Sequence, residues 1–100
     1  MEEADRGMIK LTTSNYSIWK TRMNDILYCK ELFKPIECKG YKPITITEDE
    51  WKKLNRKTIG QIRQWVDQNV FHYVAKEVDA YSLWLKLVFM REKLHRTNPL

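Results

Sequence analysis

The stretch from residue 79 to residue 90 has the sequence of a helix that is apolar around most of its circumference. Asp79 precedes the apolar run, and its carboxylate is predicted to cap the helix by accepting hydrogen bonds from the free amides of the first turn. Leu83, Trp84 and Leu87 then recur at intervals of three and four residues, which places them on one face. Because apolar neighbours widen that face, the helix needs packing partners on more than one side. The sequence therefore predicts a small helix bundle closed around Trp84.

Two other stretches have the periodicity of amphipathic helices. The first is predicted to cover residues 16–30, and its apolar stripe consists of Tyr16, Trp19, Met23, Ile26 and Leu27. The second is predicted to run from residue 48 to about residue 69, with a stripe of Trp51, Leu54, Thr58, Ile62, Trp65 and Val66. These stripes supply the partners that the last helix needs.

The start of the second of these helices carries the clearest local signal in the chain. Thr47 and Glu50 have the spacing of a capping box, in which each side chain accepts a hydrogen bond from the backbone amide of the other residue. Acidic residues in the first turn also lie at the positive end of the helix dipole. Gly60 lies inside the same helix, where glycine costs about 1 kcal/mol relative to alanine, so we expect it at a close crossing with another helix.

The remaining segments complete an all-α prediction. Residues 8–11 alternate in polarity and are expected to lie extended against the bundle. Residues 34–47 lack a helical period and contain two prolines, so we expect a loop, with residues 44–46 as a candidate extended piece. Residues 70–78 are a candidate short helix. The predicted fold is a small all-α bundle of three to five helices with an extended N-terminal segment and one long loop.

Composition bounds the domain organisation and the compartment. One hundred residues, with 12% aromatic residues and only three glycines, indicate one packed domain. We assign a flexible tail to residues 1–7 and a single helical domain to residues 8–98. The chain has no apolar run of the roughly 18–20 residues that span a membrane, and its acidic start lacks a signal-peptide core. Together with two cysteines that make no disulfide framework, this favours an intracellular, cytoplasmic location and no membrane partner.

Residue types that carry chemistry are present, but not in catalytic or metal-binding patterns. Cys29, Cys38, His72 and His95 lack the paired close spacing of zinc sites. The sequence contains neither a glycine-flanked serine nor a phosphate-binding glycine loop. Cys29 is expected to pack as a small apolar residue, and His72 to be a half-buried structural histidine. We expect no enzymatic activity, no cofactor, no metal and no small-molecule substrate.

Positive charge gives a second, distinct hypothesis. A formal net charge of +5 is compatible with a small basic nucleic-acid-binding module. The basic residues are scattered along the chain, and such groups are more often ordinary solvated faces, so nucleic-acid binding is the alternative function. The candidate contacts are Lys52, Lys53, Arg56, Lys57, Arg91, Lys93 and Arg96.

The landmarks of the chain, taken in order, resemble the N-terminal Gag region of copia-type LTR retrotransposons, a family common in plants. The resemblance extends from Leu11 to about Leu94. Its landmarks are Leu11, Asn15, Tyr16, Trp19, Met23 and Leu27, then Leu32, Phe33, Glu48, Asp49, Glu50, Trp51, Ile59 and Ile62, and finally Asp79, Ala80, Leu83, Trp84 and Leu87. The departures are Thr13 where the family often has glycine, Phe33 where tryptophan is usual, and Phe89, which comes earlier after Trp84 than the family's aromatic residue.

The resemblance implies a structural capsid module that associates with itself or with other Gag-like chains through weak contacts repeated many times. The expected signature and core residues are Leu11, Tyr16, Trp19, Met23, Leu27, Trp51, Ile62, Trp65, Leu83, Trp84 and Leu87. In the family, RNA packaging depends largely on a basic tail and a zinc knuckle, which this sequence lacks, so only weak, non-specific RNA binding is expected. The chain is a fragment, a degenerate element copy or a host protein derived from an element; the sequence leaves these open.

Overall fold

Five helices form the computed structural model, which describes residues 7–97 and the side chains of residues 7–90. They are α1 (Tyr16–Cys29), α2 (Lys34–Glu37), α3 (Glu48–Arg63), α4 (Gln68–Val74) and α5 (Ala80–Thr97). Residues 7–97 contain no β-strand, so the predicted all-α bundle is confirmed. Residues 1–6 of the predicted tail and residue 98, the predicted end of the domain, lie outside the described residues. The division into tail and domain stays a prediction.

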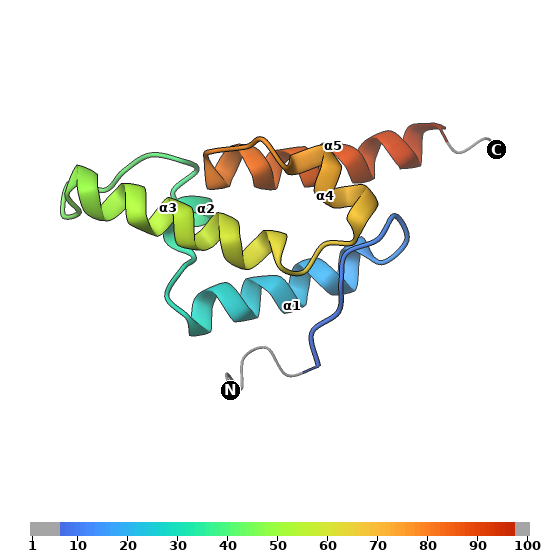
Figure 1. Ribbon diagram of the computed structural model, residues 1–100, viewed down its shortest axis with the longest axis horizontal. Coiled ribbons are helices and arrows are strands. Elements are labelled where there is room, and N and C mark those ends of the chain that lie inside the picture. Colours follow the sequence, from blue (N-terminus) through green and yellow to red (C-terminus); the bar gives the residue numbers. More distant parts are fainter. Residues whose placement is uncertain (1–6, 98–100) are drawn as a thin grey trace.

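The three long helices are stacked, with α3 between α1 and α5 (Figure 1). α1 runs in the opposite direction to α3, and α4 lies at the end of the molecule where α3 finishes (Figure 1). α5 packs against α2, α3 and α4. The most apolar helix therefore has neighbours on more than one side, as its sequence predicts.

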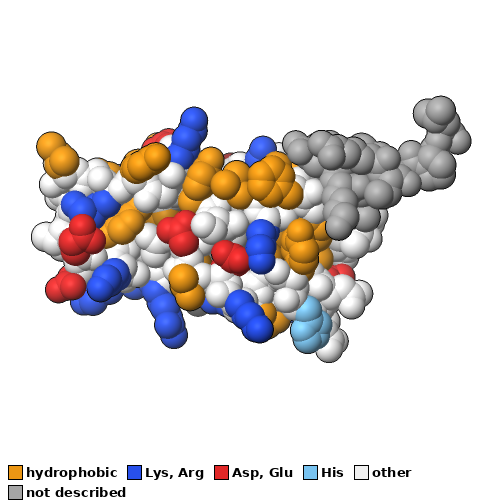
Figure 2. Space-filling view, turned by 90° about the horizontal axis from the view of Figure 1, so that it is seen from above, with side chains coloured by type: hydrophobic (Ala, Val, Ile, Leu, Met, Phe, Trp, Pro, Cys, Tyr) orange, Lys and Arg blue, Asp and Glu red, His pale blue; other side chains and the backbone are white. Residues whose placement is uncertain are grey.

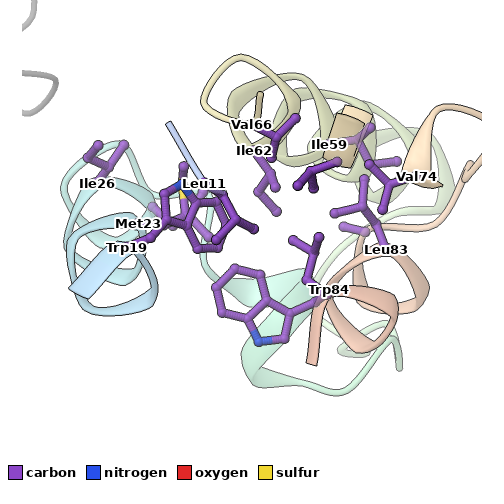
Figure 3. Packing of buried hydrophobic residues seen from close by; sticks show 14 residues of the cluster. Leu11, Trp19, Met23, Ile26, Ile59, Ile62, Val66, Val74, Leu83 and Trp84 are labelled. Carbon is purple, nitrogen blue, oxygen red and sulfur yellow. The ribbon is translucent and has the colours of Figure 1, made fainter. Parts of the chain in front are cut away.

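One apolar cluster fills the space between these helices. Its largest members are two indoles: Trp19 of α1 is fully buried, and Trp84 of α5 is 6% exposed. Their ring centres lie 5.9 Å apart at an interplanar angle of 32°, a tilted contact in the favourable range for aromatic pairs. Figure 3 shows aliphatic side chains of α3, α4 and the N-terminal segment around these rings. The core is thus built on a pair of indoles rather than on Trp84 alone.

Local capping fixes the starts of α3 and α5. The amide of Glu50 donates to Thr47 Oγ1 at 3.2 Å and the amide of Thr47 donates to Glu50 Oε1 at 3.1 Å, which confirms the capping box. Asp79 Oδ2 accepts a hydrogen bond from a first-turn amide of α5 at 2.9 Å, also as predicted. At the start of α1, Asn15 caps nothing, because its Oδ1 accepts from the amide of Thr12 at 2.8 Å. Asn15 thereby holds the N-terminal segment.

Polar side chains on the inner side of α3 tie it to other parts of the chain. Asn55 Oδ1 accepts a hydrogen bond from the amide of Ala80, the first residue of α5, at 2.9 Å. Thr58 Oγ1 donates to the carbonyl oxygen of Leu32 at 2.8 Å. Asn55 and Thr58 are both buried. Their hydrogen bonds satisfy polar groups that would otherwise be buried without a partner, which is costly. Directional bonds therefore orient α3 in addition to its apolar packing.

α3 ends at Arg63 rather than near residue 69, so that prediction was wrong. The chain then turns and pairs with the N-terminal segment: the amide of Leu11 donates to Trp65 O at 2.8 Å, and the amide of Asp67 donates to Leu11 O at 3.0 Å. This parallel bridge confirms the predicted extended stretch at the N-terminus. Backbone groups used in the bridge cannot continue the helix, and Asp67 caps α4, so the apolar run from α3 onward is split in two.

The segment predicted as a long loop begins with a short helix, α2, and the prediction is corrected there. Pro35 lies in the first turn of α2, where backbone amides have no acceptor within the helix, so proline sacrifices no hydrogen bond. Residues 44–46, predicted as extended, form a turn in which the amide of Ile46 donates to Pro43 O at 3.2 Å. Pro35, which was interpreted as part of a loop, therefore marks the start of a helix.

Gly60 lies at no helix crossing. It is exposed on α3, and a Cβ placed there would meet no atom of another element within 4 Å. The predicted close approach is therefore wrong. Glycine at this position loses more conformational entropy on folding than alanine would, and no close contact in the structure requires a residue without a side chain.

Gly60→Ala is expected to raise the free energy of unfolding by about 1 kcal/mol, because alanine has the higher helix propensity and restricts the unfolded chain. Urea denaturation should give a higher midpoint with an unchanged slope. Gly40→Ala is the opposed control: Gly40 has a φ of +82°, which disfavours any side chain, so this variant should be less stable. A lower midpoint for Gly60→Ala would contradict its open placement.

Trp84→Ala is expected to cost about 3–5 kcal/mol, because it empties a large site beside Trp19. That is a large share of the roughly 5–15 kcal/mol typical of a domain. Tyr41→Ala is the matched aromatic control: Tyr41 is 80% exposed and should change stability by less than about 0.5 kcal/mol. Thermal unfolding followed by circular dichroism measures both, and a Trp84→Ala protein that unfolds cooperatively near the parent Tm would show that Trp84 is peripheral.

Candidate interaction surfaces

The predicted signature residues lie mainly in the interior. The buried ones are Leu11, Trp19, Met23, Leu27, Trp51, Ile62, Leu83, Trp84 and Leu87. Tyr16 and Trp65 are partly buried and pack against the main cluster, whereas Trp51 is buried outside it. These side chains hold the fold together, so the candidate interaction surfaces consist of other, exposed residues.

Trp65 contributes to the structure chiefly through its backbone. It lies beyond the end of α3, and not on the apolar face of that helix as its spacing predicted. Its carbonyl oxygen accepts two hydrogen bonds, from the amide of Leu11 and from Trp19 Nε1, each at 2.8 Å. Its own Nε1 is buried without a hydrogen-bond partner among the described residues. A backbone acceptor leaves no trace in a side-chain pattern, so sequence reasoning missed this role.

The first candidate surface is the α3 cationic face, which consists of Lys52, Lys53, Arg56 and Lys57, all exposed. The other side of α3 is buried in the bundle, so packing turns these side chains outward. Residues four apart on a helix are neighbours, so Lys52 lies beside Arg56 and Lys53 beside Lys57. Within residues 7–90, none of the four forms an ion pair with a carboxylate. Glu48 and Asp49 lie one turn before Lys52 and Lys53, whereas Arg56 and Lys57 have no acidic residue at that spacing. The face therefore presents like charges that no direct ion pair neutralises.

The other basic candidates are at the end of α5. Arg91, Lys93 and Arg96 fall within the bounds of that helix, but their side chains lie outside the described residues. Their part in binding nucleic acid stays a prediction.

The second candidate surface is the α4–α5 aromatic face, which consists of Tyr73, Leu85, Lys86 and Phe89. Tyr73 is 45% and Phe89 56% exposed. Leu85 and Phe89 lie one turn apart on α5, and the ammonium of Lys86 lies 5.6 Å from the ring centre of Tyr73, within reach of a cation–π contact. Figure 2, which looks onto the α5 side, shows hydrophobic side chains among charged ones. The surface thus offers aromatic and aliphatic contact area.

An ion pair reduces the net charge of the α4–α5 aromatic face. Lys86 Nζ lies 2.8 Å from Glu77 Oε2. The hydrogen bond to Glu77, helped by its negative charge, holds the pKa of Lys86 above its ordinary value. Both side chains are partly exposed, so the pair adds little to stability. Because Lys86 is paired with Glu77, another protein can make apolar contacts with this face without burying an unpaired ammonium group.

The cysteines and the one histidine whose side chains are described do not form a site. Cys29 is exposed, because Ile26 and Leu27 take the inward positions at the end of α1, so the prediction of an apolar packer was wrong. His72 is exposed on α4, where Val70 and Val74 face the core, so the half-buried prediction was also wrong. The described residues include no cluster of three His, Cys, Asp or Glu placed to hold a metal ion. None of the described helices has the length and hydropathy of a membrane span.

Comparison with known proteins relates the chain to a transposable element. No protein-family model matches it, and no solved structure matches it. Over 87 residues, 87% of its length, the chain is 26% identical to the retrovirus-related Pol polyprotein from transposon TNT 1-94 of Nicotiana tabacum. The matched stretch is 7% of that polyprotein. The chain is therefore similar to a small part of a retrotransposon polyprotein, which supports a retrotransposon-related origin.

Proposed function

We propose that the chain is a non-enzymatic structural domain that associates with itself or with other Gag-like chains, in the manner of the capsid region of copia-type Gag. The observation that carries the proposal is a match to a retrotransposon polyprotein that extends over 87% of the length of the chain at 26% identity. The landmarks that resemble Gag are mostly core residues, which supports a shared fold. The polyprotein's other activities are not assigned to this chain, which spans 7% of its length.

Self-association is assigned to the α4–α5 aromatic face. Copies that each carry a formal net charge of +5 repel one another, so contact is least costly where the local charge is neutralised. Glu77 neutralises Lys86 at this face, and aromatic residues such as Tyr73 and Phe89 are typical anchors of protein interfaces. A patch of this size supports only a weak pairwise contact. Repetition in an assembly would supply the net affinity.

An intracellular, cytoplasmic assembly belongs to the same proposal. Cys29 and Cys38 are both free thiols. Free thiols are the normal state of cysteine in a reducing compartment. The proposal needs no disulfide at any stage.

Sedimentation velocity over a wide concentration range tests the proposal. The parent protein should show a weight-average sedimentation coefficient that rises with concentration. Phe89→Ser should weaken self-association by about tenfold or more, as loss of a central aromatic anchor does. Ile18→Ser is the matched control, since Ile18 is 51% exposed on α1, across the bundle from α5, and its loss should leave association unchanged.

Two results would overturn the proposal. One is a parent protein that stays monomeric throughout the range, both alone and mixed with an intact copia-type Gag protein. The other is an equal loss of association in the Phe89→Ser and Ile18→Ser variants, which would remove the assignment to the α4–α5 aromatic face. Thermal unfolding of both variants verifies that they remain folded.

A further inference from the structure

The α3 cationic face carries a like-charge repulsion that no ion pair among the described residues neutralises. Lys52 and Arg56 form one like-charge pair at i,i+4 spacing, and Lys53 and Lys57 form a second. Like charges at this spacing destabilise a helix. Glu48 and Asp49, one turn before Lys52 and Lys53, offset part of this repulsion without forming direct ion pairs, and Glu50 is engaged in the capping box. Arg56 and Lys57 have no acidic residue at that spacing. An external polyanion would turn this repulsion into attraction.

The helix that carries these cations is held in place. α3 is closed at its start by the capping box and is bonded through Asn55 to α5 and through Thr58 to Leu32. The cations therefore form two rows on a fixed backbone, and the two residues of each row are about 6 Å apart along the helix axis. A ligand with regularly spaced negative charges can meet both rows without any rearrangement of the backbone.

The composition of the face points to phosphate rather than to protein. The other exposed residues from Glu48 to the C-cap Gln64 are Glu48, Asp49, Glu50, Gly60 and Gln64, so no exposed apolar or aromatic side chain lies among the cations. Stable protein interfaces have an apolar core, which this face lacks. Backbone phosphates need only positive charge, and the face has no aromatic ring on which a base could stack.

We propose that the α3 cationic face binds the phosphate backbone of nucleic acid without sequence preference. Lys52, Lys53, Arg56 and Lys57 supply the charge, and counterion release drives binding. The site is separate from the α4–α5 aromatic face, so this inference stands independently of self-association.

Fluorescence anisotropy with labelled oligouridine, titrated at several salt concentrations, tests the inference. The test variant is Lys53→Gln with Arg56→Gln and Lys57→Gln. The matched control is Lys10→Gln with Lys20→Gln and Lys76→Gln, which removes the same number of positive charges from exposed positions elsewhere. The test variant should lower the slope of log K against log salt by about 2, at about 0.7 per lost phosphate contact. The control should keep the parent slope.

Four outcomes would overturn the inference. The first is no binding by the parent at low salt, and the second is an equal loss of slope in both variants, which would make net charge alone responsible. The third is equal affinity for polyglutamate of matched charge, which would indicate an acidic protein partner. Oligoadenine RNA and single-stranded DNA should bind within a few-fold of oligouridine, whereas strong discrimination among them would contradict sequence-blind binding. Repeating the titration on Phe89→Ser separates this result from self-association.

Discussion

The carbonyl oxygen of Trp65 is the point on which the arrangement of the chain depends. It accepts hydrogen bonds from the amide of Leu11 and from Trp19 Nε1. The first bond attaches the N-terminal segment to the turn between α3 and α4, and the second attaches α1 to the same turn. Both donors belong to residues whose side chains are fully buried, so the bonds are shielded from water. This one acceptor therefore joins three segments that are distant in sequence.

Much of the fold could be predicted because its signals are local. The capping box at Thr47 and Glu50 and the cap at Asp79 depend on residues within one helical turn, and periodicity identified the buried face of each long helix. The end of α3 could not be predicted in the same way. Periodicity continues past Arg63, but the backbone there is claimed by Leu11, more than fifty residues earlier in the chain. A non-local bond overrode a local preference.

The errors among single side chains have a related cause. Cys29 and His72 were both expected to be at least partly buried, yet Ile26 and Leu27 take the inward positions of α1 and Val70 and Val74 those of α4. Both residues are therefore exposed. Gly60 was expected at a crossing, but α3 meets its neighbours on another face. For the interaction surfaces, the sequence named Lys53 and Lys57 as candidate contacts, while only the structure shows that neither has an ion-pair partner within the described residues.

Two surfaces of different chemistry on different helices have a consequence for the proposed assembly. If copies associate through the α4–α5 aromatic face, the α3 cationic face of each copy stays open to solvent. The cationic faces of the associated copies, each of which binds weakly alone, then form an array along which one phosphate backbone can run. After the first face has bound the nucleic acid, binding by each further face is intramolecular. Because counterion release scales with the number of phosphates neutralised, such an array would bind nucleic acid far more tightly, and with a far steeper salt dependence, than a single copy. Self-association would thus strengthen a contact that is weak and sequence-blind in a single copy.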